Sequence, residues 1–280
     1  MKMNDLATPF LADYEATANY YEMYFQQHPD VFDFYFQFHC KNKEEKLNKA
    51  LLQHPNKLLE MKDVTEKLAR NIEEITTKYE KMFNVIITDE VHIFVGLGGS
   101  NAYTTYKEKP GVAFCIERIT SEETGLRTLI AHEFGHVIHH SLTLRVGVKE
   151  GDIDWQSPST WLIQEGIAIY LSTQVVEAEQ DVYFAFQRDE EWLVFAEENK
   201  EGIIAKFQKD LVESSSHEVY KEWFSINGGE HFGYTRLAYY IGYEMVRTLV
   251  KRIGIEQTIL FWLQSNFKKQ MNSLLMEIKK

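Results

Sequence analysis

The chain has 280 residues, of which 44% are hydrophobic and 14% aromatic, and this composition is typical of a folded globular protein with a sizeable core. Its formal net charge of −12 disfavours nucleic acid and anionic membrane surfaces as partners, because both carry negative charge. The sequence shows no secretory signal, no apolar run long enough to span a membrane, and two cysteines, Cys40 and Cys115. We therefore expect a cytoplasmic protein without a disulfide framework.

Residues 1–82 are rich in helix formers and are predicted to form an N-terminal helical region. The segment "VFDFYFQFH" alternates loosely like a strand, but its place between two helical segments favours a buried helix. A longer helix should follow, because its apolar residues form a single helical stripe: Val64, Leu68, Ile72, Ile75 and Tyr79. This region carries no obvious chemistry, so we expect it to contribute packing.

Residues 83–280 are predicted to form a second domain, unless the chain is one continuous domain. "NVIITDEVHIFVGLGG" and "GVAFCIERI" are rich in strand formers, and "GLGGSNAYTTYKEKPG" between them is expected to be a loop, either a hairpin connection or a flap. Thr120 and Glu123 fit a capping box, which predicts a helix from about Ser121. The remainder is mostly helical. The expected fold class is α+β, predominantly helical, with a small sheet beside this helix.

The stretch "LIAHEFGHVIHH" contains the motif H-E-x-x-H at His132, Glu133 and His136. Residues four positions apart on a helix share a face, so the two imidazoles can converge on one metal ion, and zinc suits neutral imidazole. Glu133 is rotated by about 100° from His132, so it can reach a water on the metal without being a ligand. The motif predicts a metal hydrolase with Glu133 as general base.

Two further histidines, His139 and His140, follow the motif. His139 lies nearly on the face of His132 but about 10 Å further along the helix axis, too far for both to bind one ion. The zinc proteases that recruit a third histidine after a glycine turn are excluded, because their later positions are His139 and Leu142 here. We expect His139 and His140 to be surface residues or to support the ligands, and the third ligand to come from elsewhere.

The segment "STWLIQEGIAIY" offers Glu165 as that third ligand. Glu165 falls on or beside the buried face of a predicted helix, and a buried carboxylate is unfavourable unless it is paired or binds a metal. Two histidines, one glutamate and a water form a known catalytic zinc set. Gly166 and Ala168 are small, which would let two helices approach closely enough for Glu165 to reach the ion.

The motifs "HEFGH" and "WLIQEGIAIY" together resemble the gluzincins, the zinc peptidases of the thermolysin-like and aminopeptidase-N-like clan. The chain looks closest to small bacterial predicted Zn-dependent proteases, in which a later segment reads roughly G-Y-x-x-G-Y; here it is "AYYIGYEMV". Specific identities are confined to these three segments. The resemblance implies a zincin-like catalytic core, Zn²⁺ on His132, His136 and Glu165, and Glu133 as general base.

Three features depart from the gluzincin pattern. The interval between the two motifs is longer than usual, so it must contain an extra loop, and this loop carries the rival ligands Glu150, Asp152 and Asp154. Ile169 stands where thermolysin-like enzymes have an aspartate, so the groups that support the ligands must differ. The exopeptidase signature G-x-M-E-N is absent, which leaves aminopeptidase specificity unsupported.

Peptide hydrolysis also needs a donor to the oxyanion of the tetrahedral intermediate. In related enzymes a tyrosine or histidine from the C-terminal part serves, and the resemblance favours Tyr239, then Tyr243, with His231 a weaker candidate. Packing on a helical stripe also explains both tyrosines. In this clan the strand that matches "GVAFCIE" is often a sheet edge that pairs with an extended substrate, which we expect here as well.

The predicted function is therefore a zinc-dependent peptidase that acts on peptides or a small protein. One alternative is a deformylase-type zinc amidase, whose third ligand is an upstream cysteine; Cys115 is the nearby candidate, but its context "FCIE" lacks E-G-C-L. Another is a non-catalytic binding protein on a zincin scaffold, which would not need Glu133. The substrate, the cleavage preference and the oligomeric state do not follow from the sequence.

Overall fold

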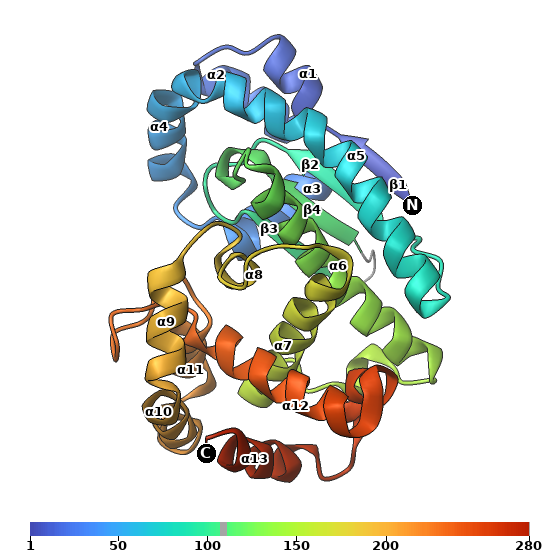
Figure 1. Ribbon diagram of the computed structural model, residues 1–280. Helices are drawn as coiled ribbons and strands as arrows, with labels where there is room; N and C mark the ends of the chain where they lie inside the picture. Colours follow the sequence, from blue (N-terminus) through green and yellow to red (C-terminus); the bar gives the residue numbers. More distant parts are fainter. Residues whose placement is uncertain (107–110, 280) are drawn as a thin grey trace. The chain divides into compact units, whose positions relative to one another are not determined.

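The computed structural model describes residues 1–106 and 111–279, and the chain divides into two compact units, Met1–Glu133 and Phe134–Lys280. The division falls inside helix α6 (Glu123–Arg145), so this helix belongs to both units (Figure 1). The described residues are mostly helical with one four-stranded sheet, which confirms the predicted α+β class. The predicted domain boundary between residues 82 and 83 stays a prediction. None of the described helices is both long and apolar enough to cross a membrane.

The first unit combines the sheet with the helices that precede α6. Its helices are α1 (Ala7–Ala12), α2 (Ala18–Gln27), α3 (Pro29–Phe34), the π-helix η1 (Tyr35–His39), α4 (Lys43–Gln53), the 3₁₀ helix η2 (His54–Asn56), α5 (Leu58–Phe83) and the 3₁₀ helix η3 (Ile116–Arg118). The predicted stripe of α5 is fully buried, which confirms that prediction. The aromatic segment before residue 40 is helical as predicted, but it is only partly buried, since Phe34 and Phe38 are exposed.

The sheet has the order β1-β2-β4-β3, with β1, β2 and β4 parallel and β3 antiparallel to β4. Its strands are β1 (Lys2–Asp5), β2 (Glu90–Phe94), β3 (Ala102–Thr105) and β4 (Gly111–Cys115). β2 and β4 confirm the two predicted strands. The sequence missed β1, which is short and polar, and β3, which lies in the expected loop. Residues 107–110 of that loop lie outside the described residues.

The prediction that "GVAFC" forms a sheet edge is wrong. These residues form β4, which pairs with β2 on one side and with β3 on the other. All five residues of β4 are buried. β3 is the edge strand on this side of the described sheet.

The loop that leads into β3 is held by two buried side chains. The Glu117 carboxylate accepts hydrogen bonds from the main-chain N–H groups of Gly96 (2.9 Å) and Gly98 (2.8 Å). The Tyr35 hydroxyl accepts two more, from Leu97 (2.9 Å) and Gly99 (3.0 Å). Since four main-chain groups of this loop have fixed partners, the entry of the chain into β3 is well defined.

Helix α6 begins at Glu123, close to the predicted start near Ser121, but its capping group differs from the predicted one. The carboxylate of Glu122 accepts hydrogen bonds from two main-chain N–H groups of the first turn (2.9 and 2.6 Å), while Thr120 accepts from Glu122 itself (3.1 Å). Glu123, expected to complete a capping box with Thr120, instead accepts a hydrogen bond from Asn71 on α5.

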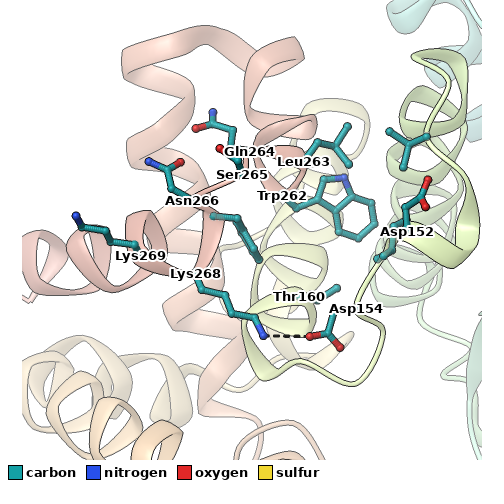
Figure 2. Close-up of a pocket in the computed structure, with 13 residues that line it drawn as sticks. Asp152, Asp154, Thr160, Trp262, Leu263, Gln264, Ser265, Asn266, Lys268 and Lys269 are labelled. Atoms are coloured by element: carbon teal, nitrogen blue, oxygen red, sulfur yellow. Dashed lines mark hydrogen bonds and ion pairs between the residues drawn. The ribbon is translucent and has the colours of Figure 1, made fainter.

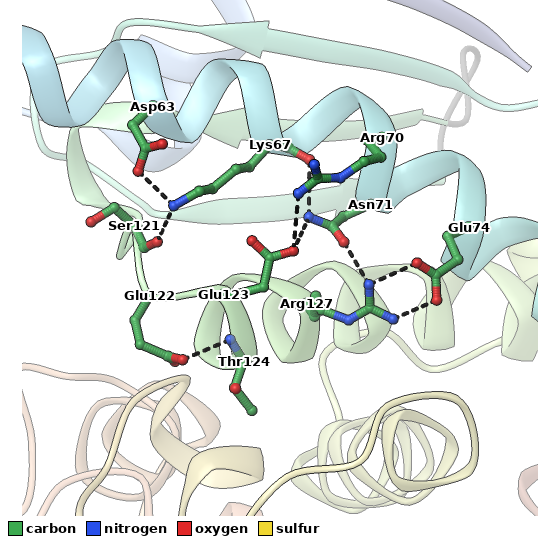
Figure 3. Close-up of polar contacts among 10 residues, drawn as sticks. All are labelled: Asp63, Lys67, Arg70, Asn71, Glu74, Ser121, Glu122, Glu123, Thr124 and Arg127. Atoms are coloured by element: carbon green, nitrogen blue, oxygen red, sulfur yellow. Dashed lines mark hydrogen bonds and ion pairs between the residues drawn. The ribbon is translucent and has the colours of Figure 1, made fainter.

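Polar contacts join α5 to the start of α6 (Figure 3). They are the hydrogen bond from Asn71 Nδ2 to Glu123 Oε1 (2.9 Å), the ion pair of Arg127 with both carboxylate oxygens of Glu74 (2.6 and 2.8 Å), and the bond from Lys67 Nζ to the Ser121 carbonyl (2.9 Å). Arg127, followed by Lys78, lowers the pKa of Glu74 to about 2. Further along, the Tyr79 hydroxyl donates to the carbonyl of Ala131 (2.9 Å). α5 thus fixes α6 up to the residue before His132.

The second unit consists of the rest of α6 and the helices that follow. They are the 3₁₀ helix η4 (Glu150–Asp152), α7 (Pro158–Val175), α8 (Val182–Ala185), α9 (Glu190–Glu198), α10 (Lys200–Glu213), α11 (Ser216–Trp223), α12 (Leu237–Ile259, interrupted at Gly254), the 3₁₀ helix η5 (Phe261–Leu263) and α13 (Phe267–Ile278). α7 and α12 pack along each other, and α7 also approaches α6.

Small residues set the distances between these helices. A Cβ added at Gly166 of α7 would lie 2.3 Å from the carbonyl oxygen of Gly242 on α12, closer than atoms can approach. A Cβ added at Gly135 of α6 would lie 3.0 Å from the main chain of Ala168 on α7. Ala168 therefore lies at the contact with α6, whereas Gly166 faces α12.

We predict that Gly166→Ala destabilises the second unit by about 1–3 kcal/mol, because the added methyl group has no space beside Gly242 and the two helices must separate. The free energy of unfolding in urea measures the effect. Gly202→Ala on α10 is the matched control, because a Cβ there meets nothing within 4 Å. It should leave stability unchanged or raise it by up to about 1 kcal/mol. Equal stability of the two variants would contradict the close helix contact.

Candidate metal centre

Helix α6 carries the H-E-x-x-H motif in buried surroundings. His132, Glu133 and His136 are 3%, 6% and 8% exposed. The residues around them on all sides of the helix are apolar and buried: Leu129, Ile130, Ala131, Phe134, Val137 and Ile138. A helix that is apolar all round is an interior helix, so the three polar side chains lie in a region with little water.

Glu165 comes from α7 and lies beside the second histidine of the motif. Its Oε2 atom is 3.6 Å from His136 Nε2. Ligand atoms of His132, His136 and Glu165 all lie within 4.8 Å of one another, and this is the group of metal-ligating side chains found in the described residues. The contact of Gly135 with Ala168, three residues after Glu165, is what brings α7 this near to α6.

The geometry and the chemistry of this group fit zinc. Two ligands at about 2.0–2.1 Å from a tetrahedral zinc ion are about 3.3 Å apart, close to the separation of His136 Nε2 and Glu165 Oε2. Two imidazoles with one carboxylate form a donor set of catalytic zinc sites, which leave one position for water. The three residues predicted from the sequence as ligands are therefore brought together.

The rival ligands lie elsewhere. Asp152 and Asp154 line a cavity of about 590 Å³ together with residues of η5 and α13 (Figure 2). Asp154 forms an ion pair there with Lys268 (3.0 Å), and Asp152 accepts a hydrogen bond from the main chain of Lys149 (3.0 Å). Neither belongs to the group of three described above. The side chain of Glu150 lies outside the described residues.

Cys115, the ligand required by the amidase alternative, is fully buried on β4, and burial raises the pKa of its thiol. In the described part of the chain it does not belong to the metal-ligating group. A thiol with a raised pKa is a poor zinc ligand, because zinc binds the thiolate.

Glu133 has a hydrogen-bond partner that the sequence did not indicate. The hydroxyl of Thr104 on β3 donates to Glu133 Oε2 (2.8 Å) and lies 3.2 Å from the main-chain carbonyl oxygen of Glu133. Thr104 was expected in a loop, and no local pattern links it to a residue 29 positions away. The hydrogen bond between Thr104 and Glu133 forms only because β3 lies beside α6 in the folded unit.

His139 and His140 were expected to be surface residues or to support the ligands; the first of these expectations is wrong, since they are 1% and 6% exposed, and the second stays a prediction. The His139 ring packs on Trp262 with ring centroids 4.0 Å apart, and Trp262 Nε1 donates to the Thr143 hydroxyl (3.1 Å). Burial, and secondly the nearby His136, lower the pKa of His139 to about 3, so its ring is neutral at pH 7. His139 is thus part of the core of the second unit.

Tyr239 and Tyr243 are both half-buried on α12. Gly242 of the same helix contacts Gly166, the residue after Glu165, so this part of α12 lies beside the α7 turn that carries Glu165. The Arg236 guanidinium lies 5.6 Å from the centre of the Tyr239 ring.

Tyr220 on α11 is a third tyrosine near the site, which no sequence pattern indicated. Its ring packs on Trp161 of α7, with ring centroids 5.3 Å apart. Partial burial and the charge of Glu165 raise the pKa of Tyr220. The Nε2 atom of His231, the weaker candidate, lies at hydrogen-bond distance from Asp210 Oδ2 (2.8 Å). Asp210 also accepts a hydrogen bond from Trp223, so His231 has a structural partner of its own.

A protein-family model described as "Putative zinc dependent peptidase (DUF5700)" matches residues 21–268. The chain belongs to this family. The match spans most of both units and includes all three residues of the metal-ligating group. The cofactor is accordingly Zn²⁺, and the chain is a member of a zinc peptidase family. The comparisons with curated proteins and with solved structures found no match.

We predict that Glu165→Ala weakens zinc binding by more than roughly 100-fold, because the loss of supporting residues alone weakens metal binding by about 10- to 100-fold. Competition with a chromogenic zinc chelator measures the affinity. Asp154→Ala and Cys115→Ser are the controls and should bind zinc like the unchanged chain. Loss of zinc in Cys115→Ser with retention in Glu165→Ala would support the amidase alternative.

Proposed function

We propose that this zinc peptidase is of the gluzincin type, with a zincin-like core in which His132, His136 and Glu165 hold the ion and Glu133 is the general base. The observation that carries the proposal is the convergence of three ligand atoms within 4.8 Å, with Glu133 on the same helix turn. Zinc, when bound there, lowers the pKa of a coordinated water and polarises the carbonyl of the scissile bond.

The side chains of the site then have two tasks, which are to transfer protons and to hold the reacting groups in position. The Glu133 carboxylate takes a proton from the attacking water and later gives it to the nitrogen of the leaving amine. Because Glu133 is only 6% exposed, few other waters compete for its carboxylate. His132 and His136 lie about one turn apart on the same helix.

We propose that the substrate binds along β3, the edge strand, and not along β4. Cys115 N donates to Asn101 O (2.7 Å), and pairs in an antiparallel ladder alternate between hydrogen-bonded and non-hydrogen-bonded. With the register Thr104↔Val112, the main-chain N–H and C=O of Thr104 therefore face away from β4. An extended peptide can add to such an edge through main-chain hydrogen bonds.

The oxyanion requires a hydrogen-bond donor, for which we propose Tyr239 or Tyr243, as the resemblance implies. The contact of Gly242 with Gly166 supports this assignment, because it brings α12 beside Glu165. Tyr220 is a further candidate, since its ring packs on Trp161, one helical turn before Glu165 on α7.

Of the alternatives, a non-catalytic binding protein has no need for a buried glutamate between the two histidines. Glu133 is such a residue, and Thr104 donates a hydrogen bond to it. The amidase alternative requires Cys115 as a ligand, and the buried, protonated thiol described above does not favour it. Both observations support the peptidase.

We predict that Glu133→Gln lowers kcat for peptide cleavage by about 10²–10⁴-fold, because glutamine cannot accept the proton of the attacking water. Zinc content should be unchanged, since Glu133 is not proposed as a ligand. Cleavage of a peptide library followed by mass spectrometry measures the effect. Glu213→Gln, an exposed residue at the end of α10, is the control. Equal kcat in Glu133→Gln and the unchanged chain would refute the mechanism.

We also predict that one of three substitutions, Tyr239→Phe, Tyr243→Phe or Tyr220→Phe, lowers kcat by about 10²–10³-fold, because removal of one oxyanion donor has this effect. KM and zinc content should stay the same, since the ring is retained. Steady-state kinetics of the three variants identify the donor. Full activity in Tyr239→Phe and Tyr243→Phe together with loss in Tyr220→Phe would overturn the assignment from the resemblance.

A further inference from the structure

We infer that Thr104 is a positioning residue, whose hydroxyl fixes the orientation of the Glu133 carboxylate from the edge strand of the sheet. The inference rests on the proposed role of Glu133 as general base. Its structural basis is the 2.8 Å hydrogen bond from Thr104 Oγ1 to Glu133 Oε2.

The carboxylate is the main partner of this hydroxyl. A threonine hydroxyl has a single hydrogen to donate, and the contact with the Glu133 carbonyl oxygen is longer, at 3.2 Å. That carbonyl oxygen also accepts the helical hydrogen bond from the residue four positions on. A hydrogen bond to a buried carboxylate is stronger than one to a neutral acceptor. The hydrogen bond from Thr104 occupies Oε2 of Glu133 and leaves Oε1 to accept the proton of the attacking water.

The donor belongs to a rigid element that is separate from α6. Thr104 lies opposite Val112 in the β3–β4 pairing, and β4 is itself paired with β2. The β-branched side chain of threonine also has restricted χ1 rotamers. The position of the hydroxyl is therefore set by the sheet, so a rotation of the Glu133 side chain breaks the hydrogen bond.

The main chain of Thr104 faces the proposed substrate. The N–H and C=O groups of Thr104 point to the open edge of β3, while its side chain points to Glu133. A substitution that removes the hydroxyl leaves the main-chain groups in place. Removal of the hydroxyl should therefore lower kcat and leave KM unchanged. This difference distinguishes a role in positioning the base from a role in binding the substrate.

The test compares zinc-loaded Thr104→Val, which keeps the shape of the side chain, with Thr104→Ser, which keeps the hydroxyl. Thr104→Val should lower kcat roughly 10- to 100-fold, the loss expected for a hydrogen bond to a charged group, with KM and zinc content unchanged. Thr104→Ser should restore most of kcat. Thr77→Val is the control, because this threonine of α5 is exposed and lies outside the proposed site.

Two further measurements complete the test. In a Glu133→Gln background, Thr104→Val should lower kcat no further, because the group that it positions is already absent. Crystal structures should show a single Glu133 orientation in the unchanged chain and in Thr104→Ser, and a displaced or divided one in Thr104→Val.

The inference is overturned if Thr104→Val keeps the kcat of the unchanged chain, if Thr77→Val lowers kcat as much as Thr104→Val does, or if the Glu133 carboxylate keeps its orientation without the hydroxyl. Equal kcat in Glu133→Gln and the unchanged chain would instead remove the proposed mechanism. In that case the crystal structures still decide whether Thr104 holds the carboxylate.

Discussion

The close approach of three helices at small residues is the constraint on which the metal-ligating group depends. A glutamate side chain is short, so Glu165 can reach His136 only if the axes of α6 and α7 are near each other. Gly135 against Ala168 provides this distance, and Gly166 against Gly242 allows α12 to pack on the other side of the same α7 turn. Interiors pack without voids, so these contacts leave little freedom in where the Glu165 carboxylate lies.

Burial of charge is the second constraint, and it explains why the site needs both a metal and a donor. α6 is surrounded by apolar side chains, and polar groups there are unfavourable unless they have partners. A zinc ion held by His132, His136 and Glu165, as proposed, would provide the partner for the two imidazoles and the carboxylate. Glu133, which must stay available to a water, has the neutral hydroxyl of Thr104 instead. A cationic partner would hold a proton-accepting carboxylate too strongly in its charged form.

The N-terminal region has a clearer role than packing alone. α5 holds α6 through ion pairs near its start and through the Tyr79 hydroxyl at Ala131, one residue before the first histidine. Tyr35 and Glu117 hold the loop that leads into β3. Glu133 and its hydrogen-bond donor Thr104 are therefore positioned by the same unit.

The sequence alone determined the features that follow from local geometry. The helical period places His132 and His136 on one face and excludes His139 as a third ligand, and the apolar stripe of α5 identifies its buried side. The identity of Glu165 as a candidate also followed, since a glutamate in an apolar helix needs a partner.

The tertiary structure decided what depends on contacts between distant segments. β1 pairs with a strand 88 positions away, β3 takes the edge expected for β4, and the His139 ring is buried against Trp262 near the end of the chain. The hydrogen bond from Thr104 to Glu133 also depends on the contact between distant segments. Periodicity describes one element at a time, whereas strand order and helix distance are set by the packing of whole elements against each other.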